Sequence, residues 1–123
     1  RNALDRVTLE IPAGGRNTSE EPYIDAAFRE LEEETGYRTD RLTHLISIRT
    51  AVAFCNERIE VYVADHLIPS KQHLDEDEYI DVHPFSLDEI MKMIFDGKIE
   101  DSKTIASIMS YHAFLLQKKN NIE

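Results

Sequence analysis

The sequence is poor in cysteine, and this limits the kinds of site it can build. Cys55 is the single cysteine among 123 residues. One thiol excludes an internal disulfide framework and a zinc site made of several cysteines. A lone cysteine among scattered histidines is also weak support for a thiol nucleophile, because such a nucleophile needs a base beside it in space.

Long hydrophobic runs are absent as well. No apolar stretch approaches the roughly 20 residues of a membrane-spanning helix, and the first residues lack a basic region followed by an apolar signal core. We therefore expect a cytosolic protein that does not bind membranes. With 41% apolar and 31% charged residues, the chain suits a single globular domain over residues 1–123.

Positive charge is scarce: 14 Lys and Arg residues stand against 24 Asp and Glu residues, for a net charge of −10. An acidic protein repels nucleic-acid backbones, so we expect no nucleic acid as a partner. Most of the excess negative charge lies in two clusters, residues 20–34 and residues 75–81. Carboxylates gathered in this way are suited to binding cations.

The first half of the chain alternates between strand and helix patterns. Residues 6–11 alternate apolar and polar side chains, as in a half-buried strand, and a Gly-rich turn follows. From about Glu20 or Pro22 to Thr35 the apolar period becomes helical, with Gly36 as the stop signal. The apolar stripe of this helix is Ile24, Ala27, Phe28 and Leu31. β-Branched stretches over 42–50 and 57–66 predict two strands.

The second half continues with weaker strand signals and clearer helix signals. Residues 68–78 are polar and predict a loop, and residues 79–85 predict a short strand. Ser86 and Glu89 have the spacing of a capping box for a helix that runs to about Asp96. A last helix is predicted over 102–118.

The predicted first helix carries four glutamates within five positions. At about 100° per residue, Glu30 and Glu34 lie about 40° apart, beside the apolar stripe. Glu33 is one step further round, Arg29 is its i−4 neighbour, and Glu32 points to ordinary surface. Such hard-oxygen side chains are suited to Mg²⁺ or Mn²⁺. The alternative is a solvated acidic face with no ligand.

Residues 15–37 fit the pattern G-x5-E-x7-R-E-U-x-E-E-x-G-U, where U is a bulky apolar or aromatic residue. The fixed positions are filled by Gly15, Glu21, Arg29, Glu30, Leu31, Glu33, Glu34, Gly36 and Tyr37. This stretch resembles the signature of the Nudix hydrolases, which cleave nucleoside diphosphates linked to another group. The segments LEIPAG, LDEDEYIDV and GKIEDSKTIASI extend the resemblance to the ADP-ribose pyrophosphatase branch.

The resemblance implies an α/β Nudix fold, in which a mixed β-sheet is sandwiched between α-helices. It also implies Mg²⁺ or Mn²⁺ as cofactor, hydrolysis of ADP-ribose to AMP and ribose 5-phosphate, and a homodimer when the protein is full length. Members of this branch have further strands ahead of the segment that matches LEIPAG. We therefore expect this chain to lack N-terminal strands.

The resemblance assigns roles to the motif residues. It implies that Glu30 and Glu34 bind the metal, that Glu33 is a ligand or the partner of one, and that Arg29 orients a carboxylate. Glu21 is similar to a residue that braces the loop or reaches a metal through water. Gly15 and Gly36 are structural members of the motif. The resemblance also implies a backbone carbonyl, from Ala13 or Gly14, in the metal shell.

The resemblance further implies a general base from the second acidic cluster. Glu76 is the candidate, and its neighbours Asp75, Asp77 and Glu78 stay open as alternatives, as does a loop that is merely solvated. The other candidates are Glu57 as a further site carboxylate and Arg16 and Arg49 as phosphate contacts. Val52, Ala53 and Phe54 stand where the branch often has Pro-Gly-Phe, which is a departure from its pattern at the expected substrate contacts.

Two alternative functions stay open within this interpretation. One is hydrolysis of another nucleoside diphosphate sugar or of a dinucleotide. The other is a catalytically silent Nudix-like module that binds a nucleotide, against which the intact set of Arg29, Glu30, Glu33 and Glu34 argues. An acidic interaction domain with no ligand is the least favoured interpretation.

Overall fold

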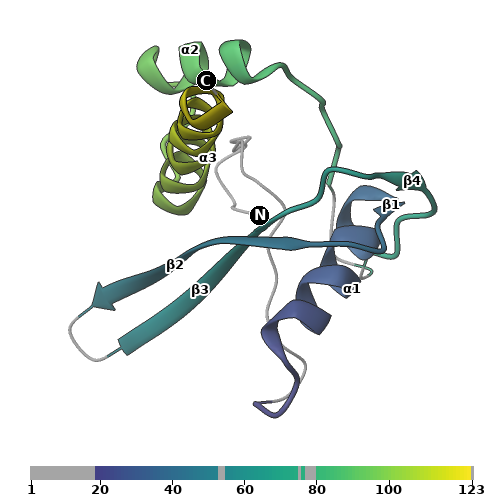
Figure 1. Cartoon of the computed structure of the whole chain (residues 1–123). Coiled ribbons are helices and arrows are strands. Elements are labelled where there is room, and N and C mark those ends of the chain that lie inside the picture. Colours follow the sequence, from purple (N-terminus) through teal and green to yellow (C-terminus); the bar gives the residue numbers. More distant parts are fainter. Residues whose placement is uncertain (1–18, 53–54, 75, 77–79, 123) are drawn as a thin grey trace. The chain divides into compact units, whose positions relative to one another are not determined.

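The computed structural model of the chain describes residues 19–122, except 53–54, 75 and 77–79 (Figure 1). Its elements, in chain order, are α1 (Tyr23–Thr35), β1 (Tyr37–Arg38), β2 (Thr43–Val52), β3 (Cys55–Val63), β4 (Ile68–Pro69), α2 (Leu87–Phe95) and α3 (Ser102–Ile122). The strand predicted over 6–11, and the candidates Ala13, Gly14, Gly15 and Arg16, lie outside the described residues. No helix within the described part is long and apolar enough to cross a membrane.

The described residues fall into two compact units. The first comprises residues 19–44 and 62–83 and contains α1, β1 and β4. The second comprises residues 45–61 and 84–122 and contains α2, α3 and most of β2 and β3. A single domain over residues 1–123 stays a prediction.

Helix α1 begins and ends where the sequence predicts. The backbone N–H groups of Asp25 and Ala26 donate to the Pro22 carbonyl at 3.1 and 3.2 Å. At the other end, Gly36 adopts a φ of 76°, a left-handed conformation that glycine reaches at little cost. Its N–H donates to the Glu32 carbonyl at 3.0 Å and closes the last turn.

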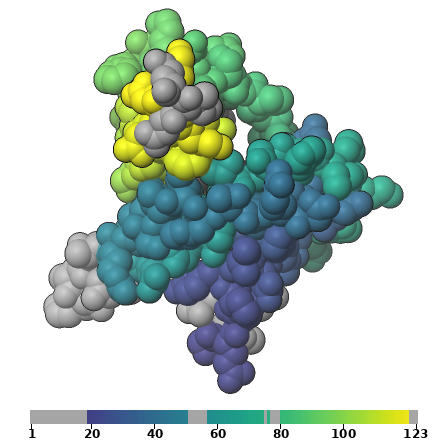
Figure 2. All heavy atoms as spheres, in the orientation of Figure 1, coloured from purple at the N-terminus to yellow at the C-terminus, as the bar shows by residue number. Residues whose placement is uncertain are grey.

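The apolar stripe predicted for α1 is only partly correct. Phe28 and Leu31 are half-buried, but Ile24 is 37% exposed, and the buried residue of the helix is Ala26. Ile24 lies in the first turn, where few neighbours cover it, and the start of α1, purple in Figure 2, lies at the surface. The predicted stripe is therefore wrong at its N-terminal end.

Strands β1 and β4 form a short antiparallel pair in which Tyr37 lies opposite Pro69 and Arg38 opposite Ile68. The loop predicted over 68–78 is therefore wrong at its first two residues. Proline lacks an N–H and is confined to strand edges and ends, and Pro69 is the last residue of β4. The pair places the residues that follow β4 next to the C-terminal end of α1.

Strands β2 and β3 pair with one another, and they confirm the strands predicted over 42–50 and 57–66 with shifted ends. Consecutive paired strands joined by so short a connection are antiparallel, because a parallel pair needs a long crossover. The described strands thus form two two-stranded sheets.

The short strand predicted over 79–85 is wrong for residues 80–85, which belong to no strand. Pro84 cannot donate a ladder hydrogen bond, and two of the apolar side chains of this stretch are exposed: Val82 by 42% and Phe85 by 41%. Alternating residues form a strand only when a partner strand covers one face and accepts the ladder bonds.

Helices α2 and α3 confirm the predicted starts. The Ser86 hydroxyl accepts from the Glu89 N–H at 3.1 Å, and the Glu89 carboxylate accepts from the Ser86 N–H at 2.9 Å, which is the predicted capping box. These hydrogen bonds lower the pKa of Glu89. Before α3, the Asp101 carboxylate accepts from the Thr104 N–H at 3.0 Å. Helix α3 continues to Ile122, past the predicted end at residue 118.

Candidate functional site

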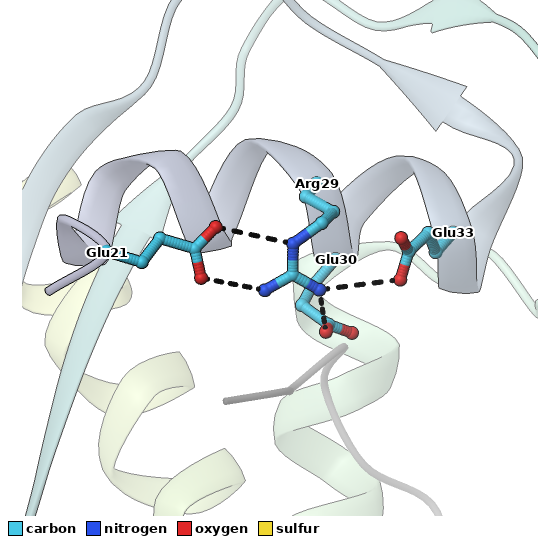
Figure 3. A network of polar contacts seen from close by, with 4 residues as sticks. All are labelled: Glu21, Arg29, Glu30 and Glu33. Carbon is cyan, nitrogen blue, oxygen red and sulfur yellow. Dashed lines mark hydrogen bonds and ion pairs between the residues drawn. The ribbon is translucent and has the colours of Figure 1, made fainter. Parts of the chain in front are cut away.

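Arg29 gathers three carboxylates along one face of α1 (Figure 3). Its Nη2 lies 3.0 Å from Glu21 Oε1, and its Nε lies 3.4 Å from Glu21 Oε2. Its Nη1 donates to Glu30 Oε1 at 2.7 Å and lies 3.6 Å from Glu33 Oε1. A planar guanidinium can serve several carboxylate oxygens at once in a fixed geometry, which an ammonium group cannot.

The electrostatics of this cluster favour a bound cation. Hydrogen bonding to Glu21 raises the pKa of Arg29; burial opposes the rise, and the hydrogen bond to Glu30 adds to it. The guanidinium therefore stays charged at neutral pH. Three carboxylates still face this one positive charge, so the cluster keeps a negative excess.

The carboxylates of α1 have the donor chemistry of a hard divalent cation, but they do not form a closed ligand set. No three His, Cys, Asp or Glu side chains among the residues that the structure describes are grouped to hold a metal ion. Glu30 has one oxygen on Arg29, which fixes its carboxylate. Glu34, one turn further along α1, is half-buried. The ligand type fits Mg²⁺ or Mn²⁺.

The last turn of α1 binds the segment that follows β4. The Ser70 N–H donates to the Gly36 carbonyl at 2.7 Å, and the His73 N–H donates to the Glu33 carbonyl at 2.8 Å. The Ser70 hydroxyl donates to the Glu32 carboxylate. Glu32, predicted to point to ordinary surface, also holds this segment through its side chain. The sequence pattern carries no signal for such contacts between residues far apart in the chain.

The remaining predicted site residues lie apart from the Arg29 cluster in the chain. Glu76 is an exposed turn residue a few positions after the anchored segment, and its neighbours Asp75, Asp77 and Glu78 lie outside the described residues. Arg49 is exposed on β2, and Glu57 on β3 accepts a hydrogen bond from the Thr50 hydroxyl at 3.3 Å. Both belong to the second unit, so their roles stay predictions.

Comparison of the sequence with models of protein families shows which family the chain belongs to. The family model described as the NUDIX domain matches residues 2–108. The chain belongs to the Nudix family. The Arg29 cluster and the end of α1 lie within the matched residues.

Two curated relatives of this Nudix chain come from bacilli. A methanol dehydrogenase activator of Bacillus methanolicus is 41% identical over 110 residues, and an ADP-ribose pyrophosphatase of Bacillus subtilis is 38% identical over 110 residues. Each alignment covers 88% of this chain and 59% of the relative. The chain therefore spans about three fifths of the length of these relatives.

A solved structure confirms the α/β Nudix fold. The crystal structure of an ADP compounds hydrolase superposes with a TM-score of 0.71 at 24% identity, over 84% of this chain and 55% of the other. At this identity the likeness shows the shared fold. The expected Nudix fold is thus confirmed.

The contacts of the Arg29 cluster also predict that replacing Arg29 lowers the stability of the protein more than replacing Arg41 does. Replacing Arg29 by Met keeps the side-chain stem but leaves Glu21, Glu30 and Glu33 without their shared cation. We expect the free energy of unfolding to fall by about 1 kcal/mol, and by less at high salt. Denaturant unfolding of the variant at low and high salt measures this loss.

Arg41 provides the matched control. It pairs with Asp65 at 3.3 Å, but the two side chains are 61% and 58% exposed. Water and salt screen such a pair, so Arg41→Met is expected to leave the unfolding midpoint unchanged. Equal losses in the two variants would contradict a special role for the Arg29 cluster.

Proposed function

We propose that the protein hydrolyses the pyrophosphate bond of a nucleoside diphosphate derivative, and that ADP-ribose, cleaved to AMP and ribose 5-phosphate, is its substrate. The observation that carries the proposal is the Arg29 cluster, which orders Glu30 and Glu33 on the motif helix of a Nudix chain. The similarity to an ADP-ribose pyrophosphatase over 88% of this chain supports the choice of substrate.

In this proposal Glu30 and Glu34 hold Mg²⁺ or Mn²⁺, with Glu33 as a further ligand or the partner of one and a carbonyl of Ala13 or Gly14 beside them. Such an ion, when bound, neutralises charge on the phosphoryl oxygens and makes water more acidic. Arg29 orients Glu30 and Glu33, and Glu21 holds the other edge of the guanidinium. The glutamates are thereby kept in one arrangement before substrate arrives.

The chain also supplies groups for the reaction itself. Glu76 takes a proton from water as the water oxygen bonds to phosphorus, while the bridging P–O bond breaks and its electrons stay with the departing phosphate oxygen. Arg16 and Arg49 contact the phosphates of the substrate, and Glu57 is a further site carboxylate. A homodimer and a cytosolic location belong to the same proposal.

A substrate panel tests the proposal. The whole protein is incubated with ADP-ribose, other nucleoside diphosphate sugars, dinucleotides and nucleoside triphosphates, each with Mg²⁺, with Mn²⁺ or with a chelator. We expect ADP-ribose to have the highest kcat/KM, equal amounts of AMP and ribose 5-phosphate as products, and no turnover with the chelator.

The other outcomes separate the alternatives. Faster cleavage of another nucleotide sugar or of a dinucleotide would replace ADP-ribose as the substrate. Tight ADP-ribose binding with no release of AMP under any condition would indicate a silent binding module. An acidic interaction domain predicts that Mn²⁺ leaves the melting temperature unchanged, which differential scanning calorimetry can check.

A further inference from the structure

The C-terminal turn of α1 obtains its hydrogen-bond partners from the segment after β4. The last carbonyls of a helix have no partner within the helix and need one from elsewhere. Here the Glu33 carbonyl accepts from the His73 N–H at 2.8 Å, and the Glu34 carbonyl accepts from the Gln72 side-chain amide at 2.6 Å. The backbone of two predicted metal-binding residues is thus held by residues 72–73.

Gln72 forms a second bond with the same amide nitrogen. Its Nε2 donates to the Ile80 carbonyl at 3.1 Å as well as to Glu34. A primary amide nitrogen carries two hydrogens, so one is available for each carbonyl. The side chain therefore joins the end of α1 to both ends of the stretch between Gln72 and Ile80, and Glu76 is the middle residue of that stretch.

Gly36 makes this contact possible. A Cβ atom added there would lie 3.3 Å from the Gln72 backbone nitrogen and 3.7 Å from the Lys71 carbonyl carbon. The first distance is tight, and the φ of 76° disfavours other residues in any case. The glycine that ends the motif thus leaves room for the backbone of Lys71 and Gln72.

Residues 70–73 are attached to the end of α1 with little help from apolar packing. Ser70, Lys71, Gln72 and His73 are all exposed, as is Glu76. A segment that buries little surface is held mainly by its hydrogen bonds, and it opens at a low free-energy cost when one is lost. Among the side chains of residues 70–73, that of Gln72 bonds to both α1 and Ile80.

We propose that Gln72 is a positioning residue, which sets Glu76 relative to the turn of α1 that carries Glu33 and Glu34. The proposal rests on the proposed function, in which Glu76 is the base and α1 holds the cation. Gln72 itself touches neither substrate nor cation. Its side chain ties residues 72 and 80, which stand on either side of Glu76 in the chain, to the end of α1, so that a proton acceptor and the carboxylates of α1 can act on the same phosphate.

Kinetics of Gln72→Ala test this role in two backgrounds. In the otherwise unchanged protein, we expect kcat to fall about 10- to 100-fold with little change in KM, because a displaced base slows the reaction rather than binding. In a Glu76→Gln background the same substitution is expected to change kcat less than about twofold, since the base that Gln72 positions is already gone.

Two further variants sharpen the kinetic test. Gln72→Glu keeps the shape of the side chain but points carboxylate oxygens at two carbonyl oxygens, so it should reduce kcat at least as much as alanine does. Gln117→Ala removes an exposed glutamine from α3 in the other unit and should leave kcat and KM unchanged. Equal losses for Gln72→Ala in both backgrounds, or no loss in either, would overturn the proposal.

Hydrogen exchange provides a readout that does not depend on activity. Gln72→Ala should speed amide exchange in peptides covering residues 70–74 and leave α3 peptides unchanged. Unchanged exchange in residues 70–74 would overturn the attachment itself. If the parent protein hydrolyses nothing in the panel, the proposed function fails and positioning fails with it, whereas faster exchange would still show the attachment.

Discussion

Replacing Glu34 by glutamine is expected to abolish divalent-cation-dependent hydrolysis while leaving the fold intact. Glutamine keeps the size of the side chain and is about as good a helix former, so α1 should persist. It removes a negative oxygen ligand, and metal-assisted charge stabilisation supplies several kcal/mol in such reactions. The loss in kcat is therefore expected to reach about a thousandfold, measured with saturating ADP-ribose and Mg²⁺.

The control for Glu34→Gln is the same change at Glu100, which is exposed in the second unit. It removes the same charge from the protein and should leave turnover unchanged. Circular dichroism and the melting temperature of both variants should match those of the parent without added metal. Unchanged turnover in Glu34→Gln across a titration of Mg²⁺ and Mn²⁺ would remove Glu34 from the site.

The parts of the fold that could be predicted from sequence are those fixed by nearby residues. The apolar period and Gly36 place the end of α1 at Thr35, and the spacing of Ser86 and Glu89 places the start of α2. Both signals act within one or two helical turns, so neighbouring residues suffice to read them. The β2–β3 hairpin is of the same kind, because its strands are consecutive.

The errors fall where distant residues decide the structure. The pair between β1 and β4 joins residues about thirty positions apart, and Ile68 and Pro69 lie in a stretch predicted to be a loop. Residues 80–85 alternate like a strand but lack a partner among the described strands. Alternation shows which residues could form a strand, but a ladder also needs a second strand at hydrogen-bonding distance.

The sequence indicated the residues of the Arg29 cluster but few of the contacts that they form. Helical spacing placed Arg29 beside Glu33, and the structure confirms this pair at 3.6 Å. The shorter contacts, to Glu30 and Glu21, depend on the direction of the guanidinium and on the turn before α1. The hydrogen bonds of Gln72 go to backbone carbonyls, which every residue carries whatever its side chain. No sequence pattern could therefore have indicated them.

Replacing Glu76 by glutamine is expected to lower kcat by about 10²- to 10⁴-fold, the usual contribution of a general base. The amide cannot accept a proton, while the carboxylates of α1 and the Arg29 cluster are untouched. KM for ADP-ribose and the Mn²⁺ concentration that gives half-maximal activity should therefore stay close to those of the parent. This separates the variant from Glu34→Gln, in which the dependence on the cation changes first.

Matched variants within the acidic cluster give the sharper test, because only the residue that takes the proton from water acts as the base. The fall in kcat for Glu76→Gln should therefore exceed that of each neighbouring variant by about tenfold or more. Asp75→Asn, Asp77→Asn and Glu78→Gln are the matched variants within the same cluster. If one of them loses kcat in this way and Glu76→Gln does not, that neighbour is the base, and the role proposed for Gln72 in setting Glu76 is overturned.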